Sequence, residues 1–204
     1  MILYGASGHA KVLIDTLKNM DINISCLFDD DSSIKILLDN DVVTGYCSDL
    51  FSDEEIIISV GDNKVRKVLV SKVKHNFGKA VSNKAVVSKY SKIGIGSVIF
   101  SGVIVQADTK IGEHCIINTR ASVDHDCLIS DFVHIAPGST ICGGVKIGEG
   151  AFIGAGAIIL PNLTVGNWVT VGAGAVVTKN IPANEKWVGN PAKSFRKNKI
   201  EKNT

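Results

Sequence analysis

An aliphatic residue recurs at every sixth position along most of the chain after residue 80. Seventeen consecutive sixth positions, from Val81 to Val177, are isoleucine or valine without a break. The position four residues further along is small or β-branched in almost every hexad, as at Ala85, Cys115 and Ala175. A period of six fits neither an α-helix nor an isolated strand, whose patterns repeat every ~3.6 and ~2 residues. It predicts a parallel β-helix of hexapeptide repeats, with one short strand and one corner per hexad.

Three hexads close one triangular coil, so the array predicts about five to six stacked coils. β-Branched residues suit the strands, and small residues suit the crowded interior of the corners. Glycine often follows the aliphatic position, as at Gly94, Gly112 and Gly154, and we expect it to relieve backbone strain there. We assign the β-helix to residues 81–182 and a C-terminal extension to residues 183–204.

The first 80 residues carry a different pattern, in which short apolar segments alternate with segments of helical periodicity. The expected strands are 1–5, 24–28 and 55–60, and the expected helices are 10–20 and 63–76. Asp62 immediately precedes the second helix and can cap its N-terminus. Strand–helix–strand order is typical of a parallel α/β unit with Rossmann-like connectivity. Residues 1–80 are therefore expected to form a small α/β domain.

Two polar segments follow the first two expected strands of this domain. The glycine turn at residues 5–9, Gly-Ala-Ser-Gly-His, presents backbone N–H groups and a helix N-terminus, which suit a phosphate. Its glycine spacing is not that of a dinucleotide fingerprint, which disfavours a nicotinamide oxidoreductase. Asp29 and Asp30 could accept hydrogen bonds from a ribose or a cationic amino group. An ordinary turn and a solvated loop remain the alternatives.

His125 is the strongest catalytic candidate. It lies two residues past Val123, at a corner of the coil, and is flanked by Asp124 and Asp126. A corner side chain points outward, and a neighbouring carboxylate fixes the tautomer of an imidazole and raises its basicity. His125 is therefore a candidate general base, and a solvated surface histidine is the alternative.

His134 lies nine residues after His125, which is half of an 18-residue coil. The two side chains are therefore far apart within one chain and can share a site only across an interface between prisms. Three-fold packing would create such a cleft three times. We expect a homotrimer with active sites between its subunits.

A zinc site is a more distant hypothesis. Three histidines can hold zinc with an open fourth position, as in a zinc hydratase similar to the γ-carbonic anhydrases. The spacings of His114, His125 and His134 put them at different corners, so we predict no metal site. The five cysteines form no Cys-x-x-Cys pair and are read as small buried hydrophobic residues. Cys127 is expected to point inward, which makes it a poor nucleophile.

Composition narrows the partners. The 22 basic and 20 acidic residues give a net charge of +2, and 6% of the residues are aromatic. Neither value favours binding to nucleic acid or to anionic lipid. The sequence contains neither a signal peptide nor an apolar run of the ~20 residues needed for membrane insertion, so a cytoplasmic protein is expected. The basic tail from Lys193 is either a solvated end or a contact for a nucleotide phosphate.

Four motifs together give the chain a family resemblance. They are the hexads with His-Asp-Cys at 125–127, Tyr-Gly-Ala-Ser-Gly-His-Ala-Lys-Val at 4–12, Phe-Asp-Asp-Asp at 28–31 and Ser-Val-Gly-Asp-Asn-Lys-Val-Arg-Lys at 59–67. The hexads resemble the left-handed β-helix acyltransferases. The other motifs narrow this to the bacterial nucleotide-amino-sugar acetyltransferases, which include the bacillosamine-pathway acetyltransferase and the sialic acid O-acetyltransferase family. The resemblance covers nearly the whole chain and implies a left-handed coil.

The resemblance also implies a reaction and a set of site residues. Acetyl-CoA would bind between adjacent β-helices of a trimer, and the α/β domain would bind a nucleotide sugar, such as a UDP-linked 4-amino sugar. His125 would act as the general base, assisted by Asp126, which is glutamate in some relatives. The implied acetyl-CoA contacts are Asn118, His134, Gly143, Ala155, Ala173 and Pro191, and the implied nucleotide-sugar contacts are Gly8, His9, Asp29, Asp30, Gly61 and Asn63.

Within this set, His134 is expected to touch the thioester carbonyl, and position 173 is glycine in some relatives. Asp29 and Asp30 favour an amino group, and hence N-acetylation, over a hydroxyl. A sugar or sialic acid O-acetyltransferase remains the nearest alternative. A non-catalytic solenoid scaffold is a further one.

Overall fold

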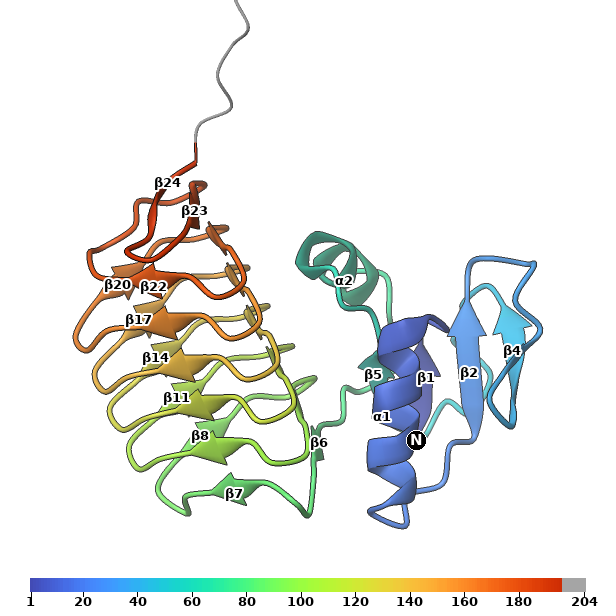
Figure 1. Ribbon diagram of the computed structural model, residues 1–204. Coiled ribbons are helices and arrows are strands. Elements are labelled where there is room, and N and C mark those ends of the chain that lie inside the picture. The colour runs from blue at the N-terminus through green and yellow to red at the C-terminus, as the bar shows by residue number, and fades with distance from the viewer. Residues whose placement is uncertain (196–204) are drawn as a thin grey trace, which may run out of the picture.

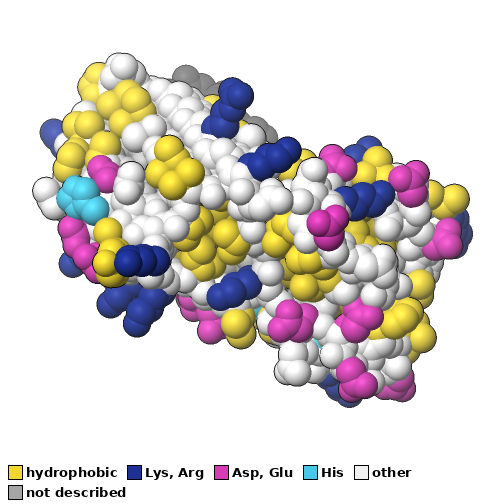
Figure 2. Space-filling model, turned by 90° about the horizontal axis from the view of Figure 1, so that it is seen from below, with side chains coloured by type: hydrophobic (Ala, Val, Ile, Leu, Met, Phe, Trp, Pro, Cys, Tyr) yellow, Lys and Arg dark blue, Asp and Glu magenta, His cyan; other side chains and the backbone are white. Residues whose placement is uncertain are grey.

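The computed structural model describes residues 1–195, arranged as an α/β domain beside a prism of stacked coils (Figure 1). Basic and acidic side chains are interspersed over both parts on the face seen from below (Figure 2), as expected from the near-neutral net charge. Most of the basic tail, residues 196–204, lies outside the described residues, and with it the phosphate contact considered for this tail.

The α/β domain has the predicted strand–helix–strand order. Strands β1 (Ile2–Tyr4), β2 (Cys26–Asp29) and β5 (Ile56–Ile58) are parallel, and β1 lies between the other two. Helix α1 (Gly8–Lys18) packs on one face of this sheet, and α2 (Asn63–Val70) packs on the other through Leu69. The carboxylate of Asp62 accepts hydrogen bonds from Lys64 N and Val65 N, which confirms the predicted cap.

Two features of this domain differ from the sequence prediction. Helix α2 ends at Val70 instead of residue 76, because the chain beyond it returns to the sheet and Phe77 bridges to Ile56. In addition, β3 (Ile36–Leu37) and β4 (Asn40–Thr44) form an antiparallel hairpin, which extends the sheet to the order β3-β4-β2-β1-β5. The hairpin is too short to leave a clear period in the sequence.

The coil has one short strand at each predicted hexad, and the strands form three parallel faces. The covered face contains β6 (Ala80–Val81), β9 (Val98–Ile99), β12 (Ile116–Ile117), β15 (His134–Ile135), β18 (Phe152–Ile153), β21 (Thr170–Val171), β23 (Lys186–Val188) and the antiparallel β24 (Lys193–Ser194). The uncharged face contains β7 (Val86–Val87), β10 (Ile104–Val105), β13 (Ser122–Val123), β16 (Thr140–Ile141), β19 (Ile158–Ile159) and β22 (Val176–Val177). The lysine face contains β8 (Lys92–Ile93), β11 (Lys110–Ile111), β14 (Leu128–Ile129), β17 (Lys146–Ile147) and β20 (Thr164–Val165).

The faces take their names from what their outward residues meet. The second residue of each strand points inward and forms a continuous aliphatic core. The first residue points outward: Lys92, Lys110 and Lys146 lie on the lysine face, whereas the six strands of the uncharged face begin with valine, isoleucine, serine or threonine. The covered face lies against the α/β domain.

Three corners connect the faces of each coil. The first corner leads from the covered to the uncharged face, as at residues 118–121, and the second leads on to the lysine face, as at 124–127. The third returns to the covered face, as at 130–133. The same three corners recur every 18 residues, because each strand pairs with the strand 18 positions along, as Val105 does with Val123.

The glycines after the aliphatic positions have a different role from the one expected. Gly154 does not have a positive φ, but a Cβ there would lie 2.5 Å from the backbone nitrogen of Ala173 in the next coil. These glycines therefore permit close stacking of coils. The left-handed conformation occurs two residues later instead, at positions such as Gly156 and Asp126, with φ of +66° and +58°.

The α/β domain and the coil share one hydrophobic core. Leu13 and Leu17 of α1 are fully buried and belong to the same cluster as Val98, Phe100 and Ile116 of the coil. The expected division at residue 80 stays a prediction about chain segments, since the apolar packing is continuous across it. This shared core fixes the domain against the covered face, where it can contribute to a site.

The two glycine roles predict different costs for the same substitution. Gly154→Ala should destabilise the protein by more than ~2 kcal/mol, because backbone blocks the new methyl group. Gly156→Ala in the same corner should cost only ~1 kcal/mol, since no atom lies within 4 Å and the cost comes from φ alone. Urea unfolding of both variants at one protein concentration measures the difference. Equal costs would contradict the close-stacking explanation.

Candidate active site

The structure places His125 at the second corner, facing outward. Its side chain is 61% exposed, and its Nδ1 lies 2.7 Å from the Asp126 carboxylate. That hydrogen bond, together with the charge of Asp124, raises the pKa of His125 above its ordinary value. With Nδ1 donating to Asp126, Nε2 is left as the basic nitrogen. The ring lies over Gly143, where a Cβ would be 2.7 Å from the imidazole.

A second group of predicted site residues meets between the α/β domain and the covered face. His134 begins β15, and its Nδ1 lies 3.2 Å from the carbonyl oxygen of Gly61. Its Nε2 lies 3.2 Å from Nδ2 of Asn118, at the start of the first corner. The ring of His9 lies 6.2 Å from that of His134, centroid to centroid. The fold thus brings together residues expected for acetyl-CoA and for the nucleotide sugar.

These hydrogen bonds define the protonation of His134. A carbonyl oxygen only accepts, so Nδ1 carries the hydrogen and donates to Gly61. Burial and the charge of Arg66 lower the pKa of His134 to about 4, which keeps it neutral. Its Nε2 then accepts from Asn118, whose Oδ1 already accepts from Thr119 N. In this tautomer His134 has no N–H left for a thioester carbonyl, and its contact with acetyl-CoA stays a prediction.

His9 is also neutral and buried against the coil. Its ring meets Phe100 edge-on, and burial followed by the charges of His134 and Arg66 lowers its pKa to about 3. Its Nε2 has no hydrogen-bond partner among the described residues. Because Gly8 starts α1 and Gly61 lies beside the His9 ring, a ligand there would meet small residues and one open ring nitrogen.

The acidic pair after β2 serves two roles. Asp29 accepts hydrogen bonds from Ala6 N and Asp31 N, so both of its oxygens anchor the surrounding turns. Asp30 accepts from the Tyr4 hydroxyl through one oxygen. The glycine turn and the acidic pair are therefore adjacent, as the fold logic predicted, and their contact with a nucleotide sugar stays a prediction.

The remaining predicted residues are spread over the coil and α2. Ala155 and Ala173 lie one coil apart at the first corner, whose backbone is linked by Gly174 N donating to Ala155 O at 2.8 Å. Pro191 follows a cis peptide bond near the end of the coil. Asn63 donates from Nδ2 to the carbonyls of Gly150 and Ala151 at the third corner, so its amide already joins α2 to the coil.

Sequence reasoning missed Arg66. Its side chain is 1% exposed, and its guanidinium donates to oxygens of both the α/β domain and the coil. Burial lowers its pKa to about 10, and no carboxylate within residues 1–195 forms an ion pair with it. In the sequence it reads as an ordinary helix cation, and only the pattern of buried positions along α2 could have marked it.

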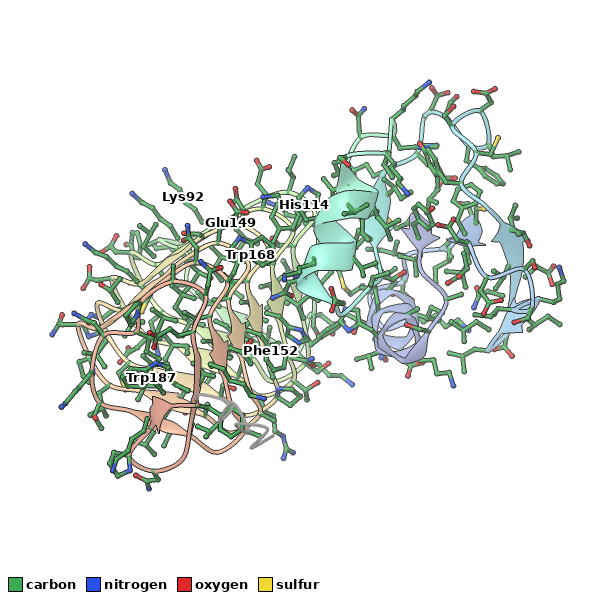
Figure 3. All side chains as sticks on the ribbon, turned by 90° about the horizontal axis from the view of Figure 1, so that it is seen from above. Lys92, His114, Glu149, Phe152, Trp168 and Trp187 are labelled. Carbon is green, nitrogen blue, oxygen red and sulfur yellow. The ribbon has the colours of Figure 1, made fainter. Side chains whose placement is uncertain are left out.

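His114 and the cysteines fit the non-metal interpretation of the coil. His114 is packed between Phe77 and Phe132, with ring centroids 4.5 and 5.3 Å away, and burial lowers its pKa to about 4. Its position beside α2 is visible from above (Figure 3). Within residues 1–195 no three histidine, cysteine or acidic side chains gather as a metal site. Cys127 points inward as predicted, and burial raises its pKa.

Two family models match the chain. The PglD N-terminal domain matches residues 1–73, and the GMPPB C-terminal domain matches residues 99–204. The comparison with curated proteins gave no match.

Solved structures match nearly the whole chain. PerB from Caulobacter crescentus, in complex with CoA and GDP-perosamine, is 34% identical, with 96% of each chain covered and a TM-score of 0.91. The acetyltransferase domain of PglB from Neisseria gonorrhoeae, in complex with acetyl coenzyme A, is 34% identical over 95% of this chain and 98% of that one, with a TM-score of 0.86. WeeI from Acinetobacter baumannii is 31% identical over 95% and 98%, with a TM-score of 0.85. The chain belongs to the hexapeptide-repeat acetyltransferases.

The family inferred from the sequence motifs is thus confirmed, as is the fold class of an α/β domain followed by a left-handed parallel β-helix. The roles predicted for single residues of this acetyltransferase stay predictions. In the described part of the chain, neither helix has the length and apolar character to cross a bilayer.

The buried histidines predict that this acetyltransferase loses stability in acid. Below pH ~6.5 the unfolded chain binds protons at His9, His114 and His134, while the folded chain does not until about pH 4 or lower. The free energy of unfolding should therefore fall as the pH drops through this window, by at most ~1.4 kcal/mol per pH unit per histidine.

His114→Phe tests this prediction, because Phe132 occupies the equivalent position one coil later with a similar φ. Urea unfolding between pH 7.5 and 4.5 should show a shallower dependence in the variant than in the wild type. His125→Ala is the control, since its pKa shift has the opposite sign and it should not flatten the curve. An unchanged slope in His114→Phe would contradict the assignment.

Proposed function

We propose that this acetyltransferase transfers the acetyl group of acetyl-CoA to the amino group of a nucleotide-linked amino sugar. The observation that carries the proposal is the outward His125, whose Nδ1 is held 2.7 Å from the Asp126 carboxylate. The relative solved with CoA and GDP-perosamine supports the same pair of substrates. UDP was the nucleotide expected from the sequence, so both GDP- and UDP-linked 4-amino sugars belong in the assay.

The chemistry needs no covalent enzyme intermediate. The neutral sugar amine attacks the thioester carbonyl, and Nε2 of His125 takes a proton as the C–N bond forms, a contribution of ~10²–10⁴ in rate. The thiolate of CoA then leaves as the tetrahedral intermediate collapses. Asp126 holds the imidazole in the tautomer that keeps Nε2 basic and stabilises the imidazolium. A backbone or amide N–H serves the oxyanion.

The proposal places the working site between protomers. Within one chain, the second corner with His125 lies opposite the covered face with His134. The uncharged face has the first corner along one edge and the second along the other. In a three-fold ring packed through this face, the second corner of one protomer meets the first corner of the next. His125 then faces a neighbouring first corner, which carries Asn118, Ala155 and Ala173.

The character of the uncharged face supports this packing. Its outward residues include Val86, Ile104 and Ile158, which are 67%, 39% and 36% exposed, and no charged residue begins any of its strands. A groove of about 230 Å³ runs along it beside Asp124, next to His125. Exposed aliphatic side chains in one continuous band are typical of a subunit interface. We propose a homotrimer with acetyl-CoA in the shared cleft.

A cytoplasmic location is part of the same proposal. All five cysteines are free thiols, as a reducing compartment favours.

The base assignment predicts the effect of two substitutions. His125→Ala should lower kcat about 100-fold or more without loss of folding, because the equivalent position one coil earlier is already Ala107. Asp126→Asn should remove the charge that raises the pKa of His125, so the acidic limb of the kcat profile should move to lower pH and the plateau should fall. Release of CoA with GDP- and UDP-linked 4-amino sugars is the assay, and free sialic acid tests the O-acetyl alternative. Near-normal turnover by His125→Ala would remove it from the mechanism.

The trimer predicts that one face is sensitive to charge and another is not. Ile104→Lys on the uncharged face should dissociate the assembly to particles of 21.7 kDa in sedimentation velocity. Leu128→Lys makes the same kind of change at an outward strand position of the lysine face, and should leave the trimer intact. A wild-type protein that sediments as a monomer at working concentration would refute the shared cleft.

A further inference from the structure

Arg66 makes an unusually complete set of hydrogen bonds for a buried cation. Its Nε donates to His114 O at 2.8 Å, and its Nη2 donates to Phe132 O and to Asn63 Oδ1 at 2.9 and 2.8 Å. Its Nη1 donates to Val60 O at 3.0 Å and to Gly61 O at 3.3 Å. The five donors of the guanidinium thus meet five oxygens, from the third corner of the coil and from the loop before α2.

One of these oxygens leads to residues of the proposed site. The Gly61 carbonyl accepts from Arg66 and also from Nδ1 of His134, 3.2 Å away. His134 in turn accepts from Asn118 through Nε2. A continuous series of hydrogen bonds therefore runs from Arg66 through Gly61 and His134 to the Asn118 amide. Its far end lies at the first corner, which the proposed trimer brings to His125 of the neighbour.

The direction of each hydrogen bond in this series is determined by its first member. If the Gly61 carbonyl turned away, His134 could carry its hydrogen on either ring nitrogen. A hydrogen on Nε2 would face the Nδ2 hydrogens of Asn118 and push the amide out of place. In the structure, one Nδ2 hydrogen is directed to His134, and the other has no acceptor within residues 1–195. The latter is available to a substrate.

We propose that Arg66 is a positioning residue of the acetyl-transfer site: it holds the Gly61 carbonyl on His134, fixes the Nδ1–H tautomer, and so orients the Asn118 amide. This inference rests on the proposed function for its effect on catalysis. It does not rest on that function for the tautomer of His134, which can be measured directly.

Lys67 provides the matched control. It is the next residue of α2 and also joins this helix to the coil, through an ion pair with Glu149 and through contacts of Nζ with the Phe132 and Trp168 rings at 5.6 and 5.5 Å. Glu149 and Trp168 lie on the side of the coil that faces α2 (Figure 3). Lys67 has no hydrogen bond to Val60 or Gly61 within the described residues, so its loss weakens the interface without altering the series.

The experiment combines ¹⁵N NMR of the imidazoles at pH 7 with steady-state kinetics on the full chain. Wild-type His134, assigned by its loss in His134→Gln, should show the Nδ1–H tautomer alone. Arg66→Lys keeps a cation but has too few donors, and should give a mixture of tautomers. Its kcat should fall about tenfold or more, with KM for both substrates within about threefold. Lys67→Met should keep the wild-type tautomer and a kcat within about twofold.

Each outcome decides the proposal. An Nε2–H tautomer in wild-type His134 overturns it, whether or not any variant folds. A wild-type tautomer in Arg66→Lys, or losses of kcat that are equal in Arg66→Lys and Lys67→Met, assigns Arg66 to stability alone and overturns it too. If the wild type acetylates no nucleotide amino sugar, the proposed function fails, and the tautomer comparison still decides whether Arg66 controls His134.

Discussion

The stacking of one coil on the next is the constraint on which the rest of the structure depends. Each strand of the coil pairs in parallel with the strand 18 residues along, so a side chain's face and height follow directly from its position in the sequence. The inward isoleucines and valines make this register strict, because a slip of one residue would turn the aliphatic side chains outward. His125 and Asn118 therefore hold their corners without any dedicated scaffold of their own.

This periodicity explains why the coil could be predicted and parts of the α/β domain could not. Every predicted hexad became a strand, since burial of its aliphatic residue is decided locally. The end of α2 was mispredicted because it depends on the bridge between Phe77 and Ile56, which are distant in sequence. His125 and Asp126 could be found as adjacent residues at one corner. The contact of Gly61 with His134 spans 73 residues, and only the family resemblance had grouped them.

The interface between the two parts is polar at its centre and yet nearly free of charge pairs. Burying a guanidinium costs several kcal/mol, and here carbonyl oxygens, which cannot be protonated, compensate for it. His9, His114 and His134 surround this cation as neutral rings, so they act as fixed hydrogen-bonding and packing groups. Of these histidines and His125, only His125 has a raised pKa, and it lies away from the interface. The structure thus separates the proton acceptor from the groups that give the site its shape.

The 18-residue register also limits how proteins of this architecture can change in length. Duplication or deletion of one whole coil beyond β20 would return every later residue to the face it had before. Loss or gain of any other number of residues within the coil would rotate the remainder of the prism, moving core positions to the surface. Length variation among descendants of such a gene should therefore occur in steps of one coil, or be confined to bulges at the corners.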